Sequence, residues 1–151
     1  MRRVSGTILV VGVLLAGAQS IRFARANPAV EGDLAAPADV HRVLQRACYD
    51  CHSNETVWPW YSGIAPASWI VHHEVTEGRR RLNFSVWPEY ASDPETAALK
   101  LHQIATFVAN GDMAPWYYRW LHPEARLTPA QRNLVATWVQ QAADTPPSHG
   151  N

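Results

Sequence analysis

The stretch Cys48-Tyr49-Asp50-Cys51-His52 decides how the rest of the chain is interpreted. Its C-x-x-C-H spacing is the signature of covalent attachment of a c-type haem. Two thiols three residues apart lie one helical turn apart, close enough to add to the two vinyl groups of one porphyrin. His52 is then held beneath the ring, where its imidazole reaches the iron as the proximal ligand. The motif therefore predicts one covalently attached haem c.

The N-terminal segment has the pattern of an export signal. Two arginines precede an uncharged apolar stretch from Val4 to Ala18, and A-x-A sequences follow at 16–18 and 24–26. The apolar run is short for a membrane-spanning helix, which needs ~20 residues. Residues 1–26 are therefore interpreted as a signal peptide or an N-terminal membrane anchor. We expect a periplasmic protein, soluble or tethered to the inner membrane.

The composition excludes several classes of protein. Apolar residues make up 47% of the 151 residues, which excludes a disordered chain. The chain has 13 basic and 13 acidic residues, so it carries no basic excess for nucleic-acid binding. Four of the basic residues lie in residues 1–26, which contain no acid, so the remainder carries nine against 13, a net charge of −4. An acidic surface favours a basic partner, and the identity of a redox partner does not follow from the sequence.

The pattern beyond residue 36 is helical. Apolar residues at 40, 43, 44 and 47 follow the i, i+3, i+4, i+7 spacing, and no alternating strand pattern occurs. Helices are predicted at 37–48, 66–78, 94–110 and 128–143, the second ending at Gly78 as a C-cap. The expected organisation is a linker at 27–36, an all-α haem-binding domain at 37–143 and a polar tail at 144–151. Residues 79–92 and 112–127 are predicted to be irregular, and a bound cofactor would order such long loops.

Three other kinds of site use the same residue types as the motif. A thioredoxin-type redox pair is expected between parallel strands, and none is predicted here. A structural zinc site needs four ligands, which Cys48 and Cys51 with His72 and His73 would supply, but His52 is then unexplained. A disulfide between the two cysteines needs no histidine. The export signal and the helical pattern favour the haem site over all three.

Met113 is the predicted second axial ligand of the iron. It is the only methionine besides the initiator, and it lies in a polar loop after a predicted helix end. Ligation by methionine and histidine raises the reduction potential and suits electron transfer. A methionine that merely fills a gap in the core is the alternative. His72 or His73, in the middle of a helix, would instead give two histidine ligands.

Other residues near the motif have weaker assignments. The aromatic run 58–61 would enclose the edge of the ring or form ordinary core. The arginines at 79–81 would pair with haem propionates or form a solvated charge run, and Asn83 and Ser85 would assist them or stabilise a turn. Asp50 is expected to face solvent.

The runs CYDCHSNETVWPWYSGIAPASW, GRRRLNFSVW and MAPWYYRWLHPEARLT resemble the bacterial haem-binding domain family, whose members have a single C-x-x-C-H motif and a cytochrome-c-like character. The resemblance extends from about Asn27 to Trp138. It implies a cytochrome-c-like helical domain around one haem, with Cys48, Cys51 and His52 at the attachment site. Met113 matches the family's methionine, although the family's loop usually reads Met-Pro-Pro and this chain has Met-Ala-Pro. The resemblance also implies export or a single N-terminal tether, and it implies no substrate or partner.

These observations favour an exported electron-transfer protein that cycles between Fe(III) and Fe(II). A module that binds or senses a small gas is the alternative, and it requires that Met113 does not ligate or is easily displaced. An enzyme such as a peroxidase ranks behind both. Peroxide chemistry needs an open iron site and usually a distal acid–base group, and the sequence identifies no catalytic residue.

Overall fold

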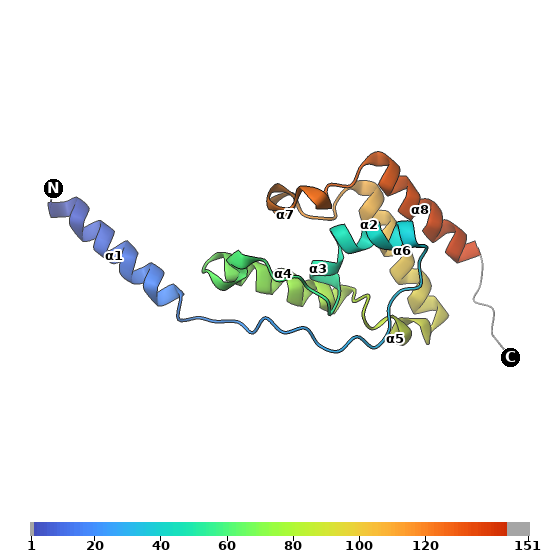
Figure 1. Ribbon diagram of the computed structural model, residues 1–151, viewed down its shortest axis with the longest axis horizontal. Coiled ribbons are helices and arrows are strands. Elements are labelled where there is room, and N and C mark those ends of the chain that lie inside the picture. The colour runs from blue at the N-terminus through green and yellow to red at the C-terminus, as the bar shows by residue number, and fades with distance from the viewer. Residues whose placement is uncertain (1, 145–151) are drawn as a thin grey trace.

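The computed structural model describes residues 2–144, and the side chains of residues 6–142. This part of the chain is all-α, as predicted, and the helices are connected by extended segments and turns (Figure 1). In chain order the helices are α1 (Arg2–Ala18), α2 (Ala38–Ala47), α3 (Tyr49–His52), the 3-10 helix η1 (Trp60–Gly63), α4 (Ala67–Arg81), α5 (Trp87–Ala91), α6 (Pro94–Asn110), α7 (Trp116–Leu121), the 3-10 helix η2 (Pro123–Ala125) and α8 (Pro129–Asp144).

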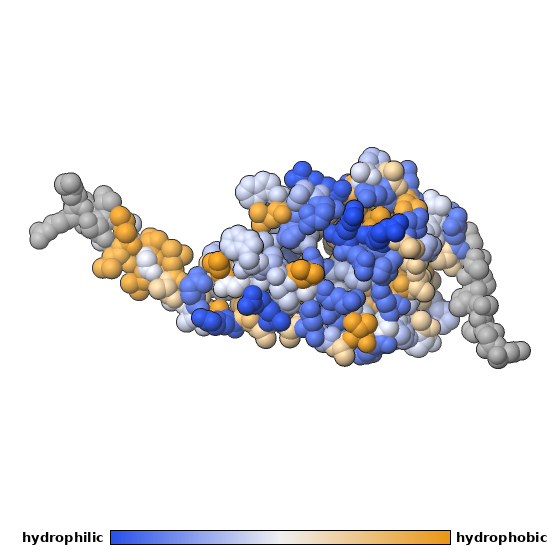
Figure 2. Space-filling view, in the orientation of Figure 1, coloured by the Kyte–Doolittle hydropathy of each residue, from blue (hydrophilic) through white to orange (hydrophobic). Residues whose placement is uncertain are grey.

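Helix α1 projects away from the rest of the protein (Figure 1). Its apolar side chains are exposed, and Figure 2 shows them as a nearly continuous apolar surface. Directly after it, Gln19 exchanges two hydrogen bonds of 3.1 Å with the backbone of Ala65, and Phe23 stacks on His72 at 4.3 Å. None of the helices within residues 2–144 combines the length and the apolar character needed to cross a membrane.

The hydrophobic core lies among α2, α6 and α8. Helix α8 packs against both α6 and α2, and Leu44, Val108 and Val135 are buried where the three helices meet. The apolar stripe predicted on α2 is buried at all four of its positions. The core therefore forms from the amphipathic faces that the sequence periodicity indicates.

The long helices begin and end at residues with well-known capping preferences. The Asp93 carboxylate accepts hydrogen bonds from the backbone N–H groups of Glu95 and Thr96 at the start of α6. Gly111 ends α6 in the left-handed conformation, with φ of 76°, which a glycine adopts without steric cost. At the start of α8, Thr128 and Gln131 form a reciprocal capping box.

The predicted loops contain further helices, and the predicted end of the second helix at Gly78 is wrong. Helix α4 continues past Gly78 to Arg81, because the glycine is needed for a close helix contact rather than for a cap. Residues 79–92 also contain α5, and residues 112–127 contain α7 and η2. Helix α7 shows no apolar stripe because most of its large side chains face solvent.

The segment between α1 and α2 is extended and lies along the domain. The backbone N–H groups of Glu31 and Gly32 donate to the carbonyl oxygen of Ser85, and Leu34 is buried in the core. An isolated bridge between Gly32 and Val86 is the sole β-pairing in residues 2–144. The predicted polar tail lies outside the described residues, except for Asp144.

Candidate functional site

A cavity of about 870 Å³ lies between α3, α4, α6 and the segment that leads into α7. Cys48, Cys51, His52 and Met113 all line it, so the fold brings the four predicted ligand residues to one place. The first three come from the beginning and the body of α3, and Met113 comes from the turn after α6. The volume lies within the range of roughly 300–1,000 Å³ that is usual for cofactor and ligand pockets.

The imidazole of His52 is fixed by the end of α4. Its Nδ1 atom lies 3.0 Å from the carbonyl oxygen of Gly78 and 3.0 Å from that of Leu82. Carbonyl oxygens only accept hydrogen bonds, so Nδ1 carries the proton and Nε2 keeps its lone pair. Burial lowers the pKa of His52, although the two carbonyl groups oppose this shift. The neutral ring therefore has a fixed tautomer, which is the state in which histidine binds a metal.

Gly78 allows α3 to approach α4 at this point. A Cβ atom at this position would overlap the carbonyl oxygen of Cys51 and come within 3.1 Å of the Cys51 side chain. Any other residue would therefore separate the two helices. The glycine in the middle of α4 brings the motif and the carbonyl groups that orient His52 into contact.

A buried hydrogen-bond network joins the motif to the segment after α4. The Asn83 side-chain amide donates to Asn54 Oδ1 at 2.9 Å, and its oxygen accepts from the Ser85 N–H at 3.0 Å. The Ser85 hydroxyl accepts from the Asn54 N–H at 2.9 Å, and the Phe84 N–H donates to the His52 carbonyl at 2.8 Å. Asn83 and Ser85 thus hold the backbone around His52, which agrees with the turn interpretation rather than with propionate binding.

The three arginines at the end of α4 have different surroundings. Arg79 donates to the Ser53 carbonyl at 2.7 Å and also contacts Ala26, Asn27 and Thr56, so it stabilises the loop after α3. The guanidinium groups of Arg80 and Arg81 lie beside Glu77 at the rim of the cavity. Only these two of the three remain available to pair with a carboxylate of a bound group.

The surroundings of the two thiols differ from those of a thiol–disulfide exchange site. Both cysteines are free, and burial raises the pKa of Cys48 and of Cys51 to about 12. Nearby carboxylates, Asp50 first among them, add to the shift at Cys51. A thiol–disulfide exchange site instead stabilises a thiolate near neutral pH. Across residues 2–144, no group of three or more His, Cys, Asp or Glu side chains is arranged to hold a metal ion.

The segment from Gly111 to Pro115 brings Met113 to the cavity. The Asp112 N–H donates to the Phe107 carbonyl at 3.1 Å, and the next residues carry Met113 and the buried Ala114 to the cavity wall. Of the two competing histidines, His73 lines the same cavity, whereas His72 stacks on Phe23. Met113 and His73 are therefore the residues that could supply a second ligand to the iron of a bound haem.

The remaining lining divides into an apolar part and a charged rim. Leu82 and Phe84 follow α4, and α6 contributes Ile104, Phe107 and Val108. The rim carries both charges, with Glu74 and Glu77 beside the cations Arg80, Arg81 and Lys100. An apolar interior with cations at one edge fits a haem, whose porphyrin is apolar and whose two propionates are anionic.

Two expectations about the neighbourhood of the motif are corrected. Asp50 is half-buried rather than free in solvent, because its carboxylate accepts from the Tyr118 hydroxyl at 2.6 Å and from the Val57 N–H at 2.9 Å. The aromatic run 58–61 is absent from the cavity lining, and Trp60 is 80% exposed. Phe84, Phe107 and Tyr118 are instead the aromatic side chains that line the cavity.

Sequence reasoning missed the residues that orient the predicted ligands. Nothing in a single sequence shows that the carbonyl groups of Gly78 and Leu82 meet His52, because the contact depends on how α3 crosses α4. Within the helix predicted at 94–110, apolar residues recur at 97, 101, 104, 105 and 108, and this spacing indicates the face that contains Ile104 and Val108. Tyr118 had no such signal, because its neighbours Tyr117 and Trp120 are exposed.

Comparison with known proteins gives one match. The family model described as "Haem-binding domain" matches residues 8–141, which is most of the chain. No curated protein and no solved structure matches this sequence. The cavity, the fixed histidine tautomer and the charged rim agree with that family. The chain belongs to the haem-binding domain family.

Proposed function

We propose that this haem protein is an exported c-type cytochrome that transfers one electron at a time. The observation that carries the proposal is the placement of His52. Its Nδ1 atom donates to two backbone carbonyl groups inside a cavity that also contains both thiols and Met113. A cavity for a loosely bound apolar molecule would need none of these groups.

Cys48 and Cys51 are proposed to hold the haem by two thioether bonds. Each thiol adds across one vinyl group, so that the sulfur bonds to a vinyl carbon and the hydrogen goes to the other carbon. Both cysteines line the cavity and neither is in a disulfide, which leaves both sulfurs available. His52 follows directly and supplies Nε2 to the iron. Replacing His52 by Ala is expected to abolish the low-spin haem spectrum, whereas an unchanged spectrum would assign the proximal position to another residue.

The bound iron supplies the redox chemistry by changing between Fe(III) and Fe(II). The protein surrounds it with the apolar side chains of α6 and with Phe84, and this burial tunes the reduction potential. Arg81 and Lys100 at the rim are proposed to balance the propionates. Because residues 27–151 carry a net charge of −4, the proposed redox partner docks through a basic surface.

Measuring carbon monoxide binding distinguishes an electron carrier from a gas-binding module. If Met113 ligates, the wild-type protein binds carbon monoxide poorly, and Met113→Ala exposes the iron. The variant then also loses the weak red absorbance band of a thioether–iron(III) bond and has a lower reduction potential. His73→Ala is the matched control, because His73 lines the same cavity. This variant is expected to keep the carbon monoxide binding, the red absorbance band and the reduction potential of the wild type.

A gas-binding module is the second candidate function, and one observation favours it. In the part of the chain that the structure describes, the backbone groups of Met113 and Ala114 form no hydrogen bond with the backbone of another segment. A loosely held ligand is easily displaced. If the wild type binds carbon monoxide readily and Met113→Ala does not change this, gas binding becomes the leading function. If neither the wild type nor Met113→Ala binds carbon monoxide and His73→Ala does bind it, His73 is the second ligand.

Export is proposed from the N-terminal segment. The arginines at 2 and 3 and the exposed apolar surface of α1 fit an export signal or a membrane anchor. Attachment of haem c takes place outside the cytoplasm, so it depends on this segment. Leu14→Arg places a charge in the apolar stretch at an exposed site and is expected to abolish haem attachment in cells. Val57→Arg, an equally exposed site in the domain, is the control, and normal holoprotein from Leu14→Arg would refute export.

A further inference from the structure

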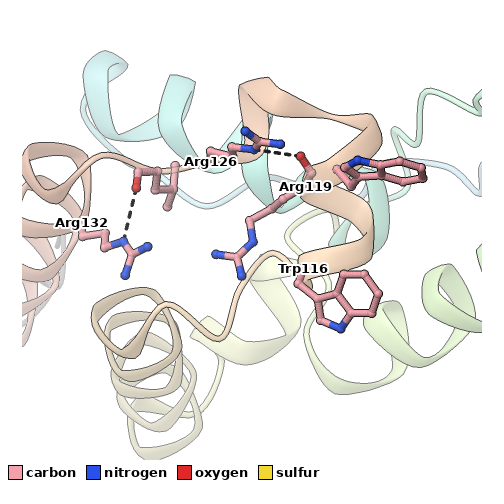
Figure 3. A pocket seen from close by; sticks show the side chains of 6 residues that line it. Trp116, Arg119, Arg126 and Arg132 are labelled. Atoms are coloured by element: carbon pink, nitrogen blue, oxygen red, sulfur yellow. Dashed lines mark hydrogen bonds between the residues drawn. The ribbon is translucent and has the colours of Figure 1, made fainter.

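A second pocket lies on the face formed by α7, the segment after η2 and the start of α8, and the haem proposal assigns it no ligand. Its volume is about 510 Å³. Figure 3 shows the guanidinium groups of Arg119 and Arg132 on either side of one hollow, with Arg126 above them and Trp116 on the outer side. Trp120 and Leu127 complete the lining, so the pocket is cationic and aromatic.

The three arginines of this pocket have no anionic partner. Each one donates to a backbone carbonyl, Arg119 to Gly111, Arg126 to Arg119 and Arg132 to Leu127. A guanidinium group has five N–H donors, so most of its donor capacity remains. Among the side chains of residues 6–142, no carboxylate forms an ion pair with any of the three. The three cations therefore lie together without an anionic partner although residues 27–151 carry a net charge of −4, and guanidinium groups match the geometry of phosphate.

The tryptophans of the pocket project into solvent. Trp116 is 73% exposed and Trp120 is 75% exposed, and the adjacent Leu121 is also exposed. Exposed indole rings next to arginines are typical of surfaces that rest at the interface of a membrane, where the ring enters the headgroup region and its N–H stays hydrated. A soluble anion would explain the arginines but not the outward-facing rings.

The position of this face relative to α1 supports a membrane as its partner. Along the long axis of the molecule, α7 and η1 lie on the side from which α1 projects (Figure 1). Trp60 in η1 is 80% exposed, so the three most exposed tryptophans come from these two elements. The apolar surface of α1 extends away on the same side (Figure 2). An anchored α1 would therefore bring this end of the domain toward the bilayer.

We infer that the pocket of Arg119, Arg126 and Arg132 binds the phosphate group of an anionic phospholipid, with Trp116 and Trp120 at the headgroup level. The domain then rests on the membrane surface rather than moving freely at the end of its N-terminal segment. The inference does not depend on the haem. It requires only that the pocket faces lipid, and each additional arginine near an anionic membrane strengthens the binding.

Hydrogen–deuterium exchange of the full-length protein in lipid nanodiscs tests this inference. Discs of phosphatidylcholine alone are compared with discs that contain equal parts of phosphatidylcholine and phosphatidylglycerol. In the anionic discs, we expect exchange in residues 115–127 to slow by at least about tenfold and to recover at high salt. Arg126→Glu and Trp120→Ser are expected to remove this protection. Arg42→Glu makes the same charge change on α2, outside the pocket, and is expected to leave the protection intact.

Three outcomes would overturn the inference. Equal exchange in both kinds of disc would show that anionic lipid is not bound. Protection that survives Arg126→Glu would place the lipid contact elsewhere. Protection produced in neutral discs by glycerol phosphate alone would assign the pocket to a soluble anion. None of these results bears on haem attachment, so the two proposals are tested separately.

Discussion

The two segments that bring ligands to the cavity are held in different ways. The segment from Cys48 to Asn54 is tied to α4 and to residues 83–85 by buried hydrogen bonds, and the packing at Gly78 leaves no free space. The segment from Gly111 to Pro115 is held by a helix end and by arginine side chains. Arg119 donates to the Gly111 carbonyl at 3.5 Å, and the guanidinium of Arg132 lies against Gly111.

This difference indicates that the side of the cavity with His52 is rigid, whereas the side with Met113 can adjust. Backbone carbonyls and buried amides cannot move without breaking several interactions, so the orientation of His52 is fixed before any cofactor binds. Flexible side chains can adjust, so the position of Met113 can follow the bound group. The proposed covalent attachment on the rigid side and the proposed Met113 ligand on the adjustable side would suit a haem that stays bound while its potential is tuned.

The largest effect is expected at Gly78. Gly78→Ala forces a Cβ atom against the backbone of Cys51, which has no room to yield, and we expect a loss of about 3 kcal/mol in the free energy of unfolding. Urea unfolding followed by circular dichroism measures this. Gly63→Ala is the matched control, because a Cβ there would meet only the Arg25 side chain at 3.8 Å. Equal stability of the two variants would contradict the rigid packing of α3 on α4.

An intermediate effect is expected at Asn83. Asn83→Ala removes two hydrogen bonds and leaves the Asn54 oxygen and the Ser85 N–H buried without partners, at a cost of about 2 kcal/mol. The same unfolding measurement applies, with Asn133→Ala on the exposed surface of α8 as the control. A variant as stable as this control would mean that the network does not hold the segment around His52.

The smallest of the three effects is expected at Gly111, which sharpens the comparison with Gly78. Gly111→Ala places a side chain in the left-handed conformation at a cost of about 1 kcal/mol, and the new Cβ meets a flexible arginine rather than backbone. We expect Gly111→Ala to remain folded and to be more stable than Gly78→Ala. The reverse order would show that the Met113 segment, and not the motif segment, is the rigid one.

The main helices were predictable, and the candidate ligand residues could be named, because their signals are local. The stripe on α2, the Asp93-Pro94 start of α6 and the Thr128 start of α8 act within a few residues, so they can be read from one sequence. The C-x-x-C-H motif is local in the same sense. These signals were sufficient for an all-α fold with Cys48, Cys51, His52 and Met113 as candidate ligands.

The rest depended on contacts between distant segments. A glycine near a predicted helix end suggests a cap, and only the packing of α3 shows that Gly78 lies inside α4. The hydrogen bonds of Arg79, and the one from Asn83 to Asn54, join residues 23–53 positions apart, which leaves no pattern in the sequence. Helix α7 was missed because an outward-facing aromatic helix lacks the apolar stripe on which helix prediction relies.

The central claim is that one haem is attached to this chain through Cys48 and Cys51. Mass spectrometry of the purified, acid-denatured protein tests it most directly, because only a covalently bound haem stays with the polypeptide. We predict a mass equal to that of the polypeptide plus one haem, and the bare polypeptide mass for the variant with both Cys48→Ala and Cys51→Ala. A coloured wild-type preparation that gives only the bare polypeptide mass would contradict the claim.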